Sequence, residues 1–225
     1  MKDLHRKALT GIIRTLVILL VALFAPVWAL RWWQGWMCLA AFFLPACAIT
    51  VWVAKHDPAL LERRVKAGVR AEKERGQKIV QGVAAVVFFA DFALPAFDHR
   101  FGWSRVPFYA EVLGDLMMVF GFAIVFVVFR ENSFTSGIIE VTENQKVVST
   151  GPYALVRHPM YSGGLMMLFG IPLALGSWWG MLINVAMTAA VVWRLLDEER
   201  FLVENLPGYA AYRETVKYRL VPFVW

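Results

Sequence analysis

The residues most able to do chemistry gather in the last third of the sequence. A stretch Arg157–Pro159 contains an arginine and a histidine, Tyr161 follows, and the pair Glu198 and Glu199 comes later. Imidazole and carboxylate groups can move protons, and arginine binds anionic groups. Acids beside tyrosine rings also suit a cationic or aromatic small molecule. These residues predict a binding or catalytic site and leave its ligand open.

The backbone around these residues is interrupted by proline and glycine. Pro152 and Pro159 stop helix formation before an apolar run, which leaves backbone donors and acceptors free. Gly163 and Gly164 follow, and glycine lets the backbone approach a ligand closely. We therefore expect a loop that presents polar groups at the start of a helix.

The composition indicates that the chain is not a soluble protein, so the site belongs to a membrane protein. Hydrophobic residues make up 59% of the 225 residues and charged residues 18%, with a mean hydropathy of +0.56. Soluble domains are about 45–50% apolar and about 25% charged. The apolar residues form blocks of roughly 18–22, about the length that crosses a membrane. The two cysteines share one apolar block, so neither a disulfide framework nor a metal site is predicted. The sequence predicts an all-α, polytopic integral membrane protein.

About six transmembrane helices are expected, over 12–30, 35–54, 79–97, 108–129, 161–178 and 181–194. Residues 1–129 would form a four-span bundle with a basic cytoplasmic loop at 55–78. Residues 130–225 would form a catalytic region consisting of a cytoplasmic loop, a two-helix membrane hairpin and a cytoplasmic tail. The stretch 57–78 alternates charged and apolar residues, which fits either a helix on the membrane surface or a solvated connector.

The distribution of Lys and Arg predicts the orientation. Of the 23 such residues, 19 fall in segments on the side of the N-terminus and three in loops on the opposite side. The remaining one, Arg14, lies near the inner end of the first span. Positive charge is retained in the cytoplasm, so we expect both termini and the site to face the cytoplasm, in an inner membrane. Anionic lipids account for the net charge of +6 without a nucleic-acid partner.

The hairpin of the last two spans brings the polar segments together. It returns the chain to the membrane depth at which it started, so Tyr161 and Glu198 are expected to lie close to each other. An acid inside a membrane span is a candidate functional residue by default. Asp115 falls near the outer end of its span, where a packing or hydration role is expected, whereas the role of Asp91 stays open.

From about Asn132 to its end, the sequence resembles the isoprenylcysteine carboxyl methyltransferase family and the related phospholipid N-methyltransferases. The resemblance rests on Gly151-Pro152-Tyr153, Arg157-His158-Pro159-x-Tyr161-x-Gly163, Glu198-Glu199-x-x-Leu202, Tyr209-x-x-Tyr212 and Pro222. It implies S-adenosyl-L-methionine as methyl donor, bound without a Rossmann fold, and a lipophilic acceptor that enters from the bilayer. Residues 218–221, before the closing proline, differ from the eukaryotic members.

The resemblance also implies roles for individual residues. The cofactor would be bound by Asn132, Tyr153, Val156, Arg157, His158, Pro159, Tyr161, Gly163, Glu198, Glu199 and Leu202. The candidate catalytic residues are Arg157, His158, Glu198, Glu199 and Arg219. A carboxylate acceptor needs only a cation, such as Arg157 or Arg219. An amine acceptor must lose a proton, which calls for a base such as His158 or one of the two glutamates.

Four functions remain open at this point. Carboxyl O-methylation of an isoprenylcysteine-type substrate is favoured, and N-methylation of a phospholipid amine of the phosphatidylethanolamine type is the alternative. A membrane reductase of the sterol reductase type, using NADPH, is a third. A non-catalytic scaffold or half of a transporter is the fourth, and the lack of two matching halves with broken helices disfavours transport. The expected partners are membrane lipids and a lipophilic substrate.

Overall fold

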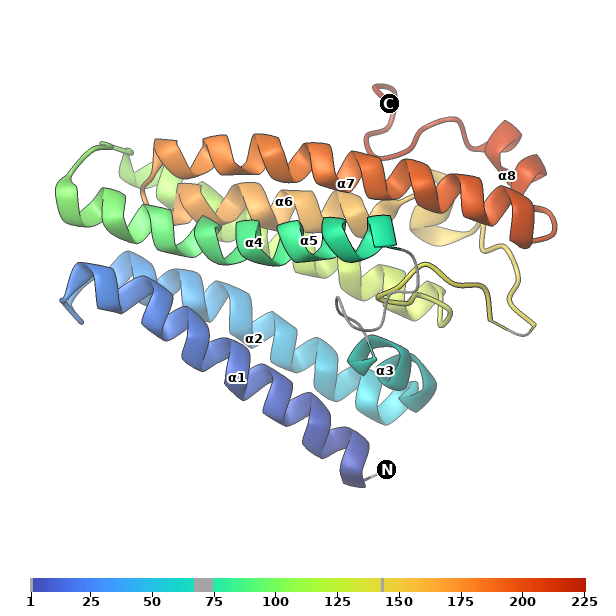
Figure 1. Cartoon of the computed structure of the whole chain (residues 1–225), viewed down its shortest axis with the longest axis horizontal. Coiled ribbons are helices and arrows are strands. Elements are labelled where there is room, and N and C mark those ends of the chain that lie inside the picture. Colours follow the sequence, from blue (N-terminus) through green and yellow to red (C-terminus); the bar gives the residue numbers. More distant parts are fainter. Residues whose placement is uncertain (1, 67–74, 143) are drawn as a thin grey trace.

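The computed structural model describes residues 2–66, 75–142 and 144–225. Within these residues the chain is helical, without strands, which confirms the predicted all-α class (Figure 1). The elements are α1 (Lys2–Val27), α2 (Trp33–His56), α3 (Pro58–Val65), α4 (Arg75–Phe101), α5 (Phe108–Glu131), the 3-10 helix η1 (Gly151–Ala154), α6 (Pro159–Ala174), α7 (Trp178–Asn205) and α8 (Tyr209–Thr215).

Among the described residues, five helices are long and apolar enough to cross a membrane, namely α1, α2, α4, α5 and α7. The sixth expected span is α6, which is apolar but has only 16 residues. At 1.5 Å per residue it is about 24 Å long, less than the roughly 30 Å of a hydrocarbon core. It ends early because the chain turns at Gly176, whose φ is +76°. Packing between α5 and α7 shields it (Figure 1).

Of the two alternatives for residues 57–78, a helix on the membrane surface and a solvated connector, a single continuous helix is not what the structure shows. Only Pro58–Val65 forms a separate helix, residues 67–74 lie outside the described residues, and α4 already begins at Arg75. Asp57 caps α3 by accepting a hydrogen bond from the Leu60 backbone N–H at 2.9 Å. Leu60 is fully buried in a cluster with residues of α2 and α5. Helix α3 therefore packs on the bundle.

Glycines let α5 and α6 come close together. A Cβ on Gly163 would lie 2.8 Å from the carbonyl oxygen of Gly121, and a Cβ on Gly121 would lie 2.5 Å from the carbonyl oxygen of Gly163. Gly114 and Gly170 make the same kind of close contact at a second point between the two helices. Small residues at such crossings allow backbone contact between membrane helices. The missing side chain of Gly163 thus makes room for α5, and the expected contact of Gly163 with the cofactor stays a prediction.

The polar segments lie at one end of the bundle. Figure 1 shows the N-terminus, α3, the segment between α5 and α6, and α8 at this end, and the short turns after α1, α4 and α6 at the other. This is the grouping that the distribution of basic residues predicts. Which side of the membrane this end faces stays a prediction.

Candidate functional site

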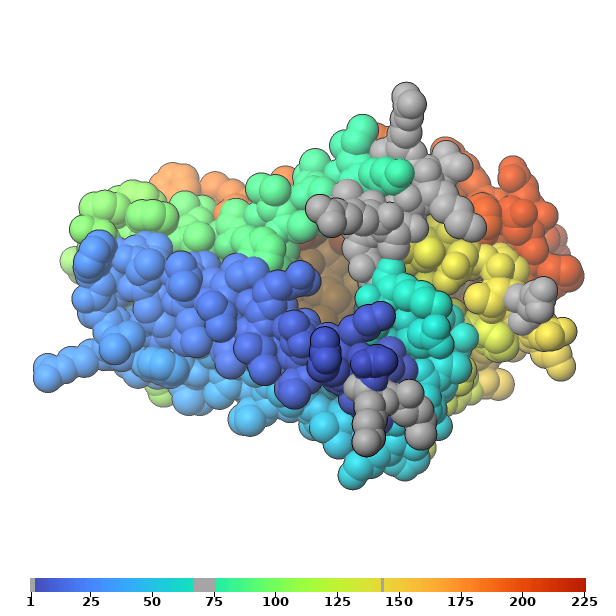
Figure 2. All heavy atoms as spheres, turned by 60° about the horizontal axis from the view of Figure 1, so that its bottom comes forward, coloured from blue at the N-terminus to red at the C-terminus, as the bar shows by residue number. Residues whose placement is uncertain are grey.

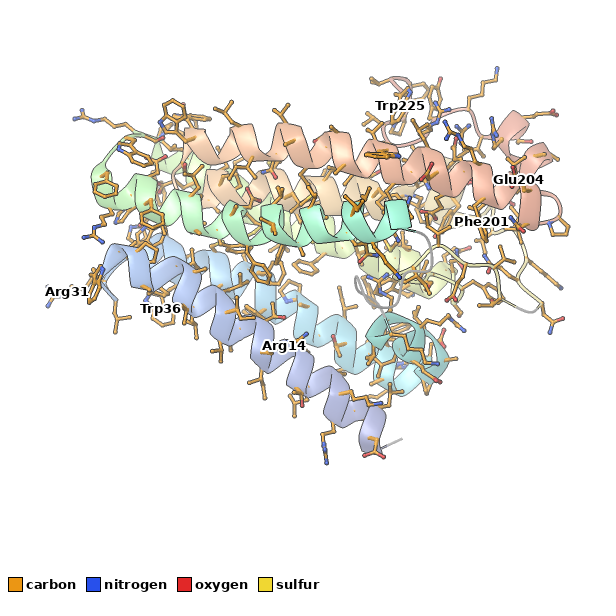
Figure 3. All side chains as sticks on the ribbon, in the orientation of Figure 1. Arg14, Arg31, Trp36, Phe201, Glu204 and Trp225 are labelled. Carbon is orange, nitrogen blue, oxygen red and sulfur yellow. The ribbon has the colours of Figure 1, made fainter. Side chains whose placement is uncertain are left out.

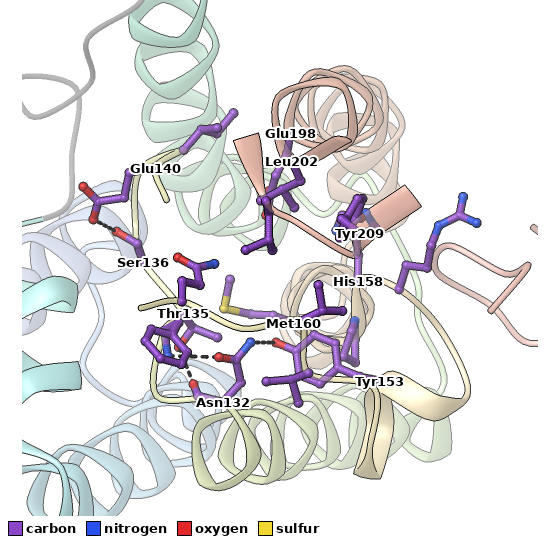
Figure 4. A pocket seen from close by; sticks show the side chains of 18 of the residues that line it. Asn132, Thr135, Ser136, Glu140, Tyr153, His158, Met160, Glu198, Leu202 and Tyr209 are labelled. Atoms are coloured by element: carbon purple, nitrogen blue, oxygen red, sulfur yellow. Dashed lines mark hydrogen bonds between the residues drawn. The ribbon is translucent and has the colours of Figure 1, made fainter. Parts of the chain in front are cut away.

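A cavity opens at the polar end of the bundle, between the segment that follows α5, the start of α6 and the end of α7 (Figure 4). Its volume accessible to water-sized groups is about 110 Å³, smaller than the roughly 300–1,000 Å³ of typical ligand pockets. Among the side chains labelled in Figure 4, Glu198 and Leu202 lie on one side and Asn132 and Tyr153 opposite them. Four separate segments of the chain thus enclose the space.

Tyr161 and Glu198 meet in the wall of this cavity. The Tyr161 hydroxyl donates to Glu198 Oε2 at 2.6 Å, and Arg194 Nε donates to the same hydroxyl at 3.1 Å. The prediction that the α6–α7 hairpin brings this tyrosine and this acid together is confirmed. The contact fixes the Glu198 carboxylate at the edge of the space.

Glu199 points away from the cavity and binds three cationic or basic side chains. Its Oε1 lies 2.6 Å from Arg157 Nε and 3.3 Å from His158 Nε2, and its Oε2 lies 3.1 Å from Arg219 Nε. The Arg157 and Glu199 side chains are only 5% and 4% exposed. Successive helix residues differ by about 100° in direction, so the two neighbouring glutamates face different partners. Glu199 therefore does not line the cavity, and its expected contact with the cofactor stays a prediction.

The segment after α8 pairs with the residues just before α6. The backbone N–H groups of Arg157 and His158 donate to the carbonyls of Tyr218 and Arg219, both at 2.9 Å. The guanidinium of Arg157 also donates to the Val216 carbonyl at 3.0 Å. Arg219 itself lies over the Trp225 ring, 4.9 Å from its centroid, and does not line the cavity. Glu199 and Trp225 hold the Arg219 side chain here, and its expected catalytic contact stays a prediction.

Asn132 and Tyr153 form the opposite wall. Asn132 ends α5, where its side-chain amide donates to the Tyr153 hydroxyl at 3.0 Å and its oxygen accepts from the Phe134 N–H at 2.9 Å. The Tyr212 hydroxyl donates to the Tyr153 carbonyl at 2.8 Å. Burial raises the pKa of Tyr153 to about 12, so its phenol is neutral at ordinary pH.

Most of the expected cofactor residues are brought together and a minority are not. The cavity is lined by Asn132, Tyr153, Arg157, His158, Pro159, Tyr161, Glu198 and Leu202. The remaining expected cofactor residues, Val156, Gly163 and Glu199, do not line it, and neither does the candidate catalytic residue Arg219. Val156 is buried beneath the η1 turn, where its N–H donates to the Pro152 carbonyl.

Sequence reasoning did not identify the residues that hold the lining loop 133–137. Arg63 donates to the Ser133 carbonyl, Arg64 Nη1 to the Ser136 carbonyl at 3.1 Å, and Arg194 Nη2 to the Gly137 carbonyl at 3.1 Å. Arg194 precedes Glu198 by one helical turn, a spacing that could have indicated it. The two arginines of α3 gave no such signal, because nothing local relates them to a loop so distant in the chain.

The fold defines a helical protein of the polytopic membrane class, with a polar cavity at one end of its bundle in the part of the chain that the structure describes. Residues 109–207 match the phospholipid methyltransferase family. The match places this region in the group of membrane methyltransferases that includes the isoprenylcysteine carboxyl and phospholipid enzymes, and the family suggests action on a lipid substrate. It runs from α5 to the end of α7 and so includes most of the cavity. A comparison with curated proteins finds no match.

Proposed function

We propose that the protein transfers a methyl group from S-adenosyl-L-methionine to a lipid acceptor at this cavity. The observation that carries the proposal is the junction of Tyr161 and Glu198 in the cavity wall, inside the region that matches the family. The motif resemblance supports the same donor.

The lining residues fit the chemistry of this donor. It carries a purine, ribose hydroxyls and a sulfonium cation. Aromatic rings of Phe134 and Tyr153 can stack on a purine or face a cation. The carboxylates of Glu140 and Glu198 can accept hydrogen bonds from hydroxyl or ammonium groups. The aromatic rings and the hydrogen-bonding groups of the cavity thus agree with a nucleoside-bearing cation.

The protein's own contribution would be alignment and proton removal. The bound donor supplies an electrophilic methyl group, which leaves its sulfur as the acceptor forms the new bond. The rate of such a displacement depends largely on alignment and on the exclusion of water. An amine acceptor also releases a proton, and Glu198 is the carboxylate in position to take it. Tyr161 and Arg194 would hold that carboxylate in place.

An amine acceptor, as in a phosphatidylethanolamine-type lipid, has the better support. Arg157 and Arg219 are both held by Glu199 rather than directed at an acceptor, whereas Glu198 faces the cavity. The matched family is also the phospholipid one. The isoprenylcysteine carboxylate is the second candidate, supported by the Arg157–Tyr161 motif and by the place of Arg157 in the cavity wall.

A lateral opening supports entry of the acceptor from the bilayer. Figure 2 shows the face of the molecule that carries α1 and α3. It is hollowed between α1, α3 and the start of α4, and a segment in the colour of α6 is visible inside the hollow. Helix α6 begins at the cavity. A lipid that entered here would reach the methyl donor without passing through water.

Ligand titration tests the donor. S-adenosylhomocysteine should bind the detergent-purified protein with micromolar affinity, and His158→Ala or Glu198→Ala should abolish binding while the protein stays monodisperse. Binding of NADPH instead would support a reductase. Wild-type affinity in both variants would refute the site. Methyl transfer to phosphatidylethanolamine, compared with transfer to a farnesyl-cysteine analogue, distinguishes the two acceptors.

We also propose that this end faces the cytoplasm, with both termini inside. Single cysteines placed in the turn after α1 should react with a membrane-impermeant maleimide added to whole cells. Cysteines placed in α8 should react only after the membrane is opened. The reverse pattern would overturn the orientation.

A further inference from the structure

The residues that follow α8 form a compact hook with an apolar surface. The backbone N–H groups of Arg219, Leu220 and Val221 all donate to the Trp225 carbonyl, at 2.8, 3.0 and 3.2 Å. Val221, Phe223 and Val224 are nevertheless 50%, 86% and 76% exposed. We call residues 221–225 the tail hook. Its exposed surface is therefore part of an ordered turn, not of a loose end.

Side-chain contacts fix the tail hook to the rest of the protein. Phe223 packs on Tyr218, with ring centroids 5.3 Å apart, and Trp225 lies under the guanidinium of Arg219. Just before the hook, the Leu220 carbonyl accepts a hydrogen bond from Ser162 Oγ of α6 at 2.6 Å. The hook is thereby tied to the start of α6.

The chain beyond α8 turns back along the bundle. Figure 1 shows α8 at the far end of the molecule and the end of the chain lying beside α7, nearer the spanning part. Figure 3 shows Trp225 in this position, well short of Glu204 at the end of α7. The hook thus lies at the depth where α7 changes from apolar to charged, which is where a membrane surface is expected.

A second, shallow cavity beside the hook is rich in cations. It is open to solvent and is lined by Arg157, Ala210, Arg213, Glu214, Lys217 and Arg219. We call it the basic pocket. Four of its six residues carry positive charge and one carries negative charge. It is separate from the candidate methyl-donor cavity, although Arg157 contributes to both walls.

Apolar and aromatic side chains next to cations are typical of segments at a membrane interface. The apolar groups enter the leaflet and the cations bind lipid phosphates. We propose that the tail hook inserts into the leaflet at this end of the bundle and that the basic pocket binds the head group of an anionic phospholipid there. This lipid would be a structural partner, distinct from the methyl acceptor.

The depth of the hook can be measured by spin labelling. A nitroxide on Phe223→Cys, with Cys38 and Cys47 replaced by serine, should collide with oxygen and be protected from a water-soluble nickel complex in phosphatidylcholine–phosphatidylglycerol vesicles. The matched control is a label on Glu204→Cys, an exposed position on the last turn of α7. It should be open to nickel. Equal nickel access at both positions would overturn the insertion.

Lipid retention tests the basic pocket. In native mass spectrometry, Arg213→Ala with Lys217→Ala should lower the preference for phosphatidylglycerol over phosphatidylcholine by about 25-fold, since each cation near an anionic surface contributes about fivefold. Arg200→Ala removes an exposed cation outside the pocket and should change retention little. An unchanged preference in the double variant would overturn the pocket. Neither measurement uses the methyl donor or turnover, so its failure is separate from failure of the proposed function.

Discussion

Replacing the two neighbouring glutamates of α7 separately by alanine tests the division of roles between them. Glu199→Ala would leave the Arg157 guanidinium buried, with only the carbonyls of Val216 and Lys217 to bind. Glu198→Ala would remove one hydrogen bond, from Tyr161, at a position that is only partly buried. Both changes replace the same residue type within one turn of the same helix, so their effects on helix propensity are matched.

The structure gives different magnitudes for the two changes. Removing one partner of a buried ion pair costs about 3–5 kcal/mol, because the remaining charge is left uncompensated. Losing one hydrogen bond to a charged group costs about 1.5–3 kcal/mol when it is buried and less when solvent can replace it. At the middle of these ranges, Glu199→Ala should lower stability by about 2 kcal/mol more than Glu198→Ala.

Thermal unfolding in detergent, followed by helical circular dichroism, measures this difference. At about 2–4 °C per kcal/mol for a chain of this size, Glu199→Ala should unfold roughly 4–8 °C below Glu198→Ala. Affinity for S-adenosylhomocysteine, measured well below both transitions, should be lost in Glu198→Ala. Equal stabilities, or a more stable Glu199→Ala, would refute the assignment of Glu199 to the buried cluster.

Three further changes test other parts of the structure. Gly121→Ala should destabilise the α5–α6 contact by about 1–3 kcal/mol through overpacking. The control Gly164→Ala, whose Cβ would meet nothing within 4 Å, should be neutral or stabilising by up to about 1 kcal/mol. Equal melting temperatures of the two variants would contradict the glycine contact. Burial raises the pKa of Tyr153 to about 12, so the stability gained from its neutral phenol is fully present below a pH of about 10 and is lost as the pH rises toward 12. In pH-dependent melting, Tyr153→Phe should therefore lose less stability than the wild type over that interval. Asp115→Asn, in α5 near the opposite end of the bundle, should leave S-adenosylhomocysteine affinity unchanged in calorimetry, and a large loss would mean that the assignment of the spans is wrong.

Much of the site's general location could be predicted from the sequence. Blocks of apolar residues, a short turn between α6 and α7, and proline at the start of α6 are local features, and together they predict that Tyr161 meets Glu198. The length of α6 was harder to predict, because the apolar run of the sequence continues beyond Ala174, where the helix ends, into the turn at Gly176. Apolar composition alone does not distinguish a short helix shielded by its neighbours from a full span.

What the sequence by itself determined is the helical membrane architecture, the grouping of polar segments at one end and a central group of the cavity residues, because hydropathy and helix-breaking residues act locally. Only the tertiary structure decided which of Glu198 and Glu199 faces the cavity, since that depends on the rotation of α7 against its neighbours. It also assigned Gly163 to the contact with α5 and Arg64 to the loop at Ser136. These roles arise from contacts between residues far apart in the chain, whose geometry no local pattern specifies.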